Sequence, residues 1–179
     1  MGSEAFGSEN YNSASKVMVW EAIHANDFVR YESDVPGENH FTHIIFGDSV
    51  EYIPARLCNY MYNDSITLPE TVKAIGASAF TNCSRLQKIH IPESVTSIGA
   101  SAFAGCKKLK QLVLPAGLQE IPEQLCNLCE ALDSVRLPAG LTVIPQKAFN
   151  GCSALRSIKI PNSVTNIGNS AFGNCPLDT

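Results

Sequence analysis

Cysteine is the residue type with the greatest chemical potential in this chain, which holds seven cysteines among 179 residues. Five of them recur every 23 residues, at Cys83, Cys106, Cys129, Cys152 and Cys175. This spacing predicts one column of side chains that fill the interior as small apolar groups. Neighbouring members would lie about 4.8 Å apart, which a disulfide tolerates, but five cysteines in a row cannot all pair. We therefore expect structural thiols.

A zinc or redox site is the alternative reading of the cysteines. Cys126-x-x-Cys129 has the spacing of half a zinc knuckle or of a redox motif. A second pair is missing, no nearby histidine completes the set, and Cys129 already belongs to the column. His40 and His43 stand beside Glu38, but histidine spacing alone is a weak indication of a metal. The sequence therefore predicts no bound metal.

Catalysis is not indicated either. Serine recurs in the pattern Gly-x-Ser-Ala at Ser78, Ser101 and Ser170, and a motif used three times in register is a folding element because an active site is needed only once. No nucleophile stands with a paired base, and no glycine loop suits a phosphate. We expect neither an enzyme nor a cofactor.

The elements that must position these residues are short and repeated. Five prolines are also 23 residues apart, at Pro69, Pro92, Pro115, Pro138 and Pro161. A run such as Leu86-x-x-Ile89-x-Ile91 comes before each proline, and its inward aliphatic residues alternate with outward ones as in a β-strand. Proline then ends the strand because it has no N–H to donate. This period predicts a solenoid, in which each unit buries its core only against its neighbours.

The return side of each unit follows the strand. A second apolar pair, such as Val95 and Ile98, allows a second short strand or an extended turn. Serine before Ala-Phe suits the start of a single helical turn, and the Asn or Gly before each cysteine suits its left-handed end. Unit four departs from this pattern, with Leu128 before the cysteine and Cys126 in the phenylalanine column. One internal ring stack is expected from Phe80, Phe103, Phe149 and Phe172.

The repeats divide the chain. Residues 41–179 form the array, with a weaker first unit recognised at an offset of 22 by Phe41, Ile44, Phe46, Val50, Ile53 and Leu57. The six units are 41–62, 63–85, 86–108, 109–131, 132–154 and 155–177. Residues 1–15 are expected to be a tag or disordered leader, since Met1-Gly2-Ser3 resembles an expression remnant. Residues 16–40 are expected to cap the first unit, with Lys16 to Asn26 helical and Phe28 to Glu32 extended. The last unit has no cap after it, which predicts edge-to-edge self-association.

The string Leu-x-x-Ile-x-Ile-Pro-x-x-Val-x-x-Ile-Gly-x-x-Ala-Phe-x-x-Cys resembles the leucine-rich repeat of the BspA type and covers about three quarters of the chain. Pro122 and Pro145 replace the family glycine. The resemblance implies an α/β architecture: a right-handed leucine-rich-repeat solenoid with a parallel sheet on its concave face and short helical turns on the return side. It also implies a surface or extracellular protein with an adhesive role, including contacts with host matrix proteins. No secretion signal follows Met1, but a native one could have been removed.

Charge suggests which face binds. Residues 1–70 hold 11 acidic and 3 basic residues, whereas residues 71–179 hold 6 acidic and 10 basic residues. Several cations fall on outward positions of the predicted strands, where a solvated face is the simpler interpretation. Docking of an acidic protein or a sulfated glycan on this face is the functional interpretation. The expected contacts are Lys88, His90, Lys110, Val113, Arg136, Arg156 and Lys159.

The expected function is binding of a protein or matrix ligand across several units. A structural spacer within a longer surface protein is the first alternative, and a glycan-positioning accessory domain of an enzyme is the second. The outward strand positions lack the aromatic residues that stack on sugars, which disfavours the second. Nucleic acid is not expected because a dense basic footprint with stacking aromatics is missing. With 45% hydrophobic residues and no long apolar run, no membrane insertion is expected.

Overall fold

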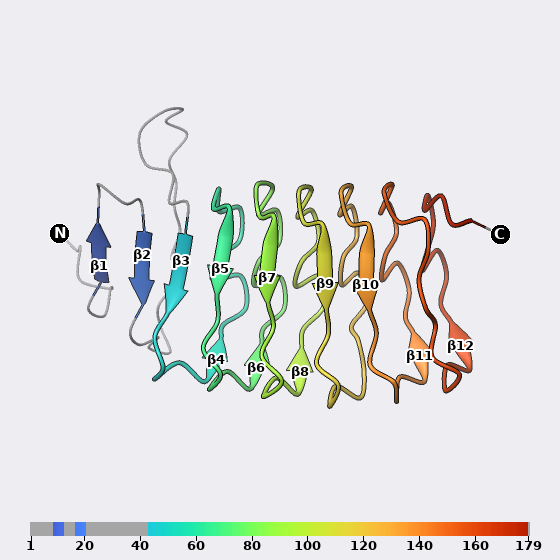
Figure 1. Cartoon of the computed structure of the whole chain (residues 1–179), viewed down its shortest axis with the longest axis horizontal. Helices are drawn as coiled ribbons and strands as arrows, with labels where there is room; N and C mark the ends of the chain where they lie inside the picture. The colour runs from blue at the N-terminus through green and yellow to red at the C-terminus, as the bar shows by residue number, and fades with distance from the viewer. Residues whose placement is uncertain (1–8, 13–16, 21–42, 179) are drawn as a thin grey trace.

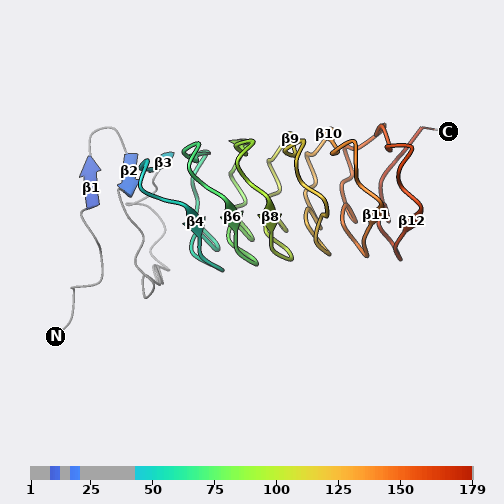
Figure 2. The same cartoon turned by 90° about the horizontal axis from the view of Figure 1, so that it is seen from below.

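Each unit of the repeat forms one coil, and the coils follow one another in a row (Figures 1 and 2). The computed structural model describes residues 9–12, 17–20 and 43–178. The first strands of successive coils are β3 (His43–Phe46), β5 (Ser65–Thr67), β7 (Lys88–His90), β9 (Gln111–Val113) and β10 (Ser134–Arg136). The second strands are β4 (Tyr52–Ile53), β6 (Ala74–Ile75), β8 (Ser97–Ile98), β11 (Val143–Ile144) and β12 (Asn166–Ile167).

The strand register confirms the repeat. Ile44, Ile66 and Ile89 are aligned partners in parallel strands, so the first step along the array is 22 residues and the next is 23. All three side chains are buried, whereas Lys88 and His90 on either side of Ile89 are exposed. This is the alternation expected of a strand with one face in the core. Parallel pairing of equivalent residues gives the predicted parallel-strand solenoid.

The N-terminal segment continues this sheet. β1 (Glu9–Asn12) pairs antiparallel with β2 (Val17–Trp20), and β2 pairs in parallel with β3 (Figure 1). The expected helix from Lys16 to Asn26 is therefore wrong at Val17–Trp20, because the backbone there pairs with the first coil. β1 likewise lies within the segment expected to be a leader. The expected extended segment Phe28 to Glu32 lies outside the described residues.

The second strands form two separate ladders, β4-β6-β8 and β11-β12, and no second strand forms in residues 109–131. Where the ladder continues, a glycine N–H donates to the isoleucine carbonyl of the preceding coil. Gly99 donates to Ile75 at 2.8 Å, and Gly168 donates to Ile144 at 2.7 Å. Pro122 and Pro145 occupy the same position in their coils and have no N–H to donate. These two substitutions explain the break.

The return side contains no helix in the described part of the chain, so the expected short helical turns are wrong. Two residues of each coil, four positions apart, have positive φ, as at Ser101 (58°) and Gly105 (73°). The left-handed residue before each cysteine is confirmed, but the serine is left-handed as well instead of starting a helix. The backbone N–H groups of Ser101, Phe103 and Gly105 donate to the next coil at 2.7–3.1 Å. Because these donors bond between coils, they are not available for intrahelical bonds.

The phenylalanine column is interrupted. Phe80 and Phe103 stack with ring centroids 5.5 Å apart, and Phe149 and Phe172 stack at 5.6 Å. Cys126 stands between the two pairs in the same column, so the expected single stack is in fact two stacked pairs. Phe80, Phe103 and Phe149 are fully buried. These rings form the centre of a core that runs through every coil.

Candidate functional site

The face formed by the first strands, which we call the strand face, carries all the residues expected to bind a ligand. Lys88 and His90 begin and end β7, Val113 ends β9, and Arg136 ends β10. The remaining expected contacts lie outside strands, at Lys110, Arg156 and Lys159. All seven side chains are exposed. The structure therefore leaves all seven accessible and places four of them within the first strands.

Most cations on the strand face lack an ion-pair partner among the described residues. Those without one are Lys88, Lys110, Arg136, Arg156 and Lys159. Elsewhere the pattern is mixed: Lys73 Nζ lies 3.0 Å from Glu51 Oε2 and Lys107 Nζ lies 2.9 Å from Glu130 Oε1, whereas Lys108 and Lys147 have no ion-pair partner among the described residues. His90 differs from the other expected contacts, because its Nε2 lies 3.5 Å from Glu70 Oε1. The strand face thus carries five cations without a direct ion pair, and exposed Asp133, which immediately precedes β10, is an acidic residue among them.

A groove opens between β10 and the last coil. We call it the β10 groove; its volume is about 510 Å³. Its walls include Val135, Arg136, Leu137, Lys159, Ile160 and Ser163. The size is within the range of small-molecule and peptide pockets, about 300–1,000 Å³. Two of the expected contacts, Arg136 and Lys159, therefore share a concave feature.

The last coil is where the sequence-based expectation of a strand is wrong. Residues 155–161 form no strand. Ile160 was expected to point inward but is 36% exposed, and Ile158 is only partly buried. Arg156 instead accepts a backbone hydrogen bond from Asp178 at 2.8 Å. Ile160 and Ser163 were missed as site residues because their repeat pattern matches coils in which the equivalent positions pair.

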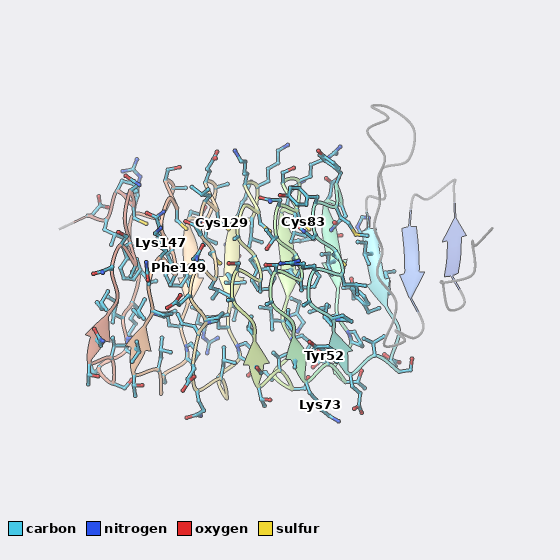
Figure 3. The ribbon with its side chains drawn as sticks, turned by 180° about the vertical axis from the view of Figure 1, so that it is seen from behind. Tyr52, Lys73, Cys83, Cys129, Lys147 and Phe149 are labelled. Atoms are coloured by element: carbon cyan, nitrogen blue, oxygen red, sulfur yellow. The ribbon has the colours of Figure 1, made fainter. Side chains whose placement is uncertain are left out.

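The cysteines occupy the interior. All seven are free, and six are buried; Figure 3 shows Cys83 and Cys129 within the row of coils. The thiol of each column member donates to a carbonyl of the preceding coil, as from Cys106 Sγ to the Phe80 oxygen at 3.2 Å and from Cys129 Sγ to the Phe103 oxygen at 3.1 Å. Each of these carbonyls also accepts a backbone N–H, as the Phe80 oxygen does from Cys83 at 3.2 Å, so the thiol is a second donor to an interior carbonyl and links neighbouring coils.

Burial changes the ionisation of several thiols. Desolvation raises the pKa of Cys58, Cys126 and Cys152, because the buried thiolate is disfavoured. A hydrogen bond with the Cys83 thiol, followed by burial, raises the pKa of Cys106. A thiol with a raised pKa is a poor nucleophile and a poor metal ligand. No cluster of metal-ligating residues occurs within the described ranges, and His40 and Glu38 lie outside them.

The fold and this face define a class of proteins: parallel-strand solenoids in which each coil adds one strand to a common surface. A model of the BspA-type leucine-rich repeat region matches residues 51–178 in six copies. The chain therefore belongs to the BspA-type leucine-rich repeat family. Proteins of this class are typically protein-interaction modules and are generally not enzymes. No curated protein matches the chain.

Solved structures agree on the fold. A leucine-rich repeat protein from Bacteroides ovatus is 26% identical, with a TM-score of 0.67, covering 76% of this chain and 42% of that one. A leucine-rich cell surface protein from Faecalibacterium prausnitzii is 24% identical, with a TM-score of 0.63, covering 100% and 53%. The leucine-rich repeat protein of T. pallidum is 18% identical, with a TM-score of 0.67, covering 99% and 90%. The chain thus spans about half or less of the first and second of these proteins.

The described residues include no helix that could cross a membrane.

Proposed function

We propose that this chain is a non-enzymatic module that binds an acidic protein through the strand face. The observation that carries the proposal is the set of five cations on that face that have no ion-pair partner among the described residues. Uncompensated charges on one surface raise the local concentration of an oppositely charged partner and speed its association. Exposed Val113, at 48%, supplies apolar contact among them.

The proposal also covers where the protein acts and which class of ligand it binds. A cell-surface adhesion role, with a host matrix protein as one class of ligand, is supported by the family and by the neighbour described as a cell surface protein. Residues 16–40 are proposed to cover the first coil, because β2 already extends its sheet. The array as a spacer that binds nothing is the alternative that the experiment must reject.

The test measures binding of the whole chain to immobilised matrix proteins at low and high salt. Reversing Lys88, Arg136 and Lys159 to Glu should weaken binding by at least about tenfold. Binding to the unchanged protein should fall as salt rises, because exposed charges are screened beyond about 8 Å at physiological ionic strength.

Lys147→Glu is the matched control. Lys147 is exposed on the return side, has no ion-pair partner among the described residues, and gives the same change of charge per site. Binding that survives both the triple reversal and high salt would place the interaction away from the strand face. No binding to any acidic or matrix protein would favour the spacer.

A further inference from the structure

Strand pairing on the strand face is interrupted between β7 and β9, resumes between β9 and β10, and stops after β10. β10 pairs with β9 on one side, and residues 155–161 on its other side form no strand. In the preceding pair of coils the Leu114 N–H donates to the Arg136 carbonyl at 3.1 Å. The equivalent bond from Leu137 to Lys159 is not formed, and neither the Leu137 nor the Lys159 N–H has an acceptor in the described part of the chain. One edge of β10 is therefore open to another strand.

The β10 groove lies along this open edge. Ser163 Oγ lies 2.9 Å from the Ala139 carbonyl oxygen and 2.7 Å from the Leu141 carbonyl oxygen, and its single proton is donated to one of them at a time. Either bond holds the last coil to its neighbour beyond the point where the strands separate. The groove is thus an opening between coils that remain joined at one end. Three residues of an extended chain, at about 3.3 Å each, match the length of β10.

The chemistry of the groove walls favours an acidic occupant. Arg136 and Lys159 stand on opposite walls, and neither has an ion-pair partner among the described residues. No aspartate or glutamate lines the groove. Val135, Leu137 and Ile160 supply apolar wall surface between the cations. An extended peptide with alternating acidic and aliphatic side chains satisfies all of these features.

We propose that the β10 groove binds an extended acidic segment of a protein partner, which adds to the free edge of β10 as a strand. This rests on the proposed function and specifies where on the strand face the partner is recognised. Backbone hydrogen bonds to the Leu137 and Lys159 N–H groups give affinity, and carboxylates on Arg136 and Lys159 give selectivity. Arg136 can bind a carboxylate through two parallel hydrogen bonds.

The test uses the whole chain and a fluorescein-labelled peptide of alternating Glu and Val, with anisotropy as the measurement. Arg136→Glu and Lys159→Glu should each weaken binding by at least about tenfold. Lys147→Glu, the matched control on the return side, should change it less than about twofold. The same peptide N-methylated at alternate amides should bind at least about tenfold more weakly, because it cannot pair as a strand. Amide exchange at Leu137 and Lys159 should slow when the unmodified peptide binds.

Each outcome of this experiment either supports or overturns peptide binding in the β10 groove. Equal effects of the Arg136, Lys159 and Lys147 substitutions, or undiminished binding of the N-methylated peptide, would overturn the groove while leaving the broader strand-face proposal intact. Absence of saturable peptide binding would overturn it too. Preference for a heparin oligosaccharide over the peptide, with the same dependence on Arg136 and Lys159, would show that the groove recognises sulfated glycan instead. Loss of matrix-protein binding in the triple reversal remains the separate test of the proposed function.

Discussion

Left-handed residues are the feature that separates this chain from a helical repeat. Serine, glutamine and lysine occupy a position where glycine would be the unstrained choice, at Ser101, Gln124 and Lys147, with φ of 54–58°. Each such residue costs about 1–2 kcal/mol of backbone strain. The strain is offset because N–H groups of the segment between the two left-handed residues of each coil face the next coil, where carbonyls accept them at 2.7–3.1 Å.

At the residue scale, the central rings should dominate stability. Phe103→Ala should lower the free energy of unfolding by about 3–5 kcal/mol, the usual effect of deleting a buried phenyl ring. Phe103 is fully buried and stacks on Phe80. Lys110→Ala, at an exposed position, should change it by less than about 0.5 kcal/mol. Chemical denaturation measures both, and equal effects would contradict the register.

The buried thiols should make stability fall with alkaline pH. Burial raises the folded-state pKa of Cys58, Cys126 and Cys152 above the ordinary value of 9.0, so the unfolded chain loses these protons first. The stabilisation is complete below the unfolded pKa and is lost as the pH rises above it. Denaturation from about pH 8 to 9.5 should show this decline, and Cys152→Ala should make it shallower.

Thiol labelling provides the independent check. The folded protein should react slowly, and the unfolded protein should show seven free thiols. Stability that does not decline with alkaline pH would contradict burial of the thiols. Fewer than seven reactive thiols in the unfolded protein would contradict the reduced state of the column.

At the scale of elements, the fit between neighbouring coils depends on a glycine column. A Cβ atom added at Gly99 would lie 2.3 Å from the backbone nitrogen of Ala77. Gly117, by contrast, has nothing within 4 Å of an added Cβ. Pro122 and Pro145 fill the column position where the ladder of second strands is broken. The ladder of second strands therefore continues where a glycine lets neighbouring coils approach closely, and it is broken where proline takes the place of that glycine.

This pair of glycines gives a matched experiment. Gly99→Ala should destabilise by about 1–3 kcal/mol, because the neighbouring backbone must move. Gly117→Ala should be neutral or should stabilise by up to about 1 kcal/mol, because it restricts the unfolded chain without a clash. Thermal or denaturant melts of the two variants decide. Similar losses of stability at both positions would mean that backbone propensity, and not the close approach of neighbouring coils, determines the effect of the substitution.

The elements differ in how well the sequence predicted them. Alternation around Ile89 predicted the strands and their inward faces, because side-chain direction in a strand depends only on parity. Residues such as Ser101 were assigned to a helical turn, because local propensity does not reveal a backbone donor that bonds to the next coil. Ile158 and Ile160 match the strand pattern, yet no strand forms there. The β10 groove depends on that missing pairing and could not be predicted.

At the scale of the whole molecule, order should decline toward the last coil. Leu112 and Val135 are buried, whereas their equivalent Ile158 is only partly buried. Ile167 of β12 is 49% exposed, while its pairing partner Ile144 is fully buried. Repeat arrays are stabilised by nearest-neighbour interfaces, so a coil with weaker contacts opens more readily than one in the centre.

Hydrogen exchange should report this gradient directly. The Phe103 amide, which donates to Leu125 at 3.0 Å, should exchange only through global unfolding. The Lys159 amide has no acceptor among the described residues and should exchange rapidly in the absence of a partner. Mass spectrometry or NMR of the unliganded chain measures both. Protection at Lys159 equal to that at Phe103 would show that the last coil pairs as the others do.

The hydrogen bonds between coils also have a direction. On the return side the donors face the following coil, as from Phe103 to Leu125, whereas Gly99 and Thr96 donate to the preceding coil. Every interface therefore presents donors at one place and acceptors at another, and it accepts a neighbour in one orientation only. Each junction between coils therefore fixes the direction in which the next coil can be added. A duplicated segment of 23 residues that keeps the glycine N–H of the second ladder can be inserted between two coils with these donors still opposite acceptors, so the length of the array can evolve one whole coil at a time.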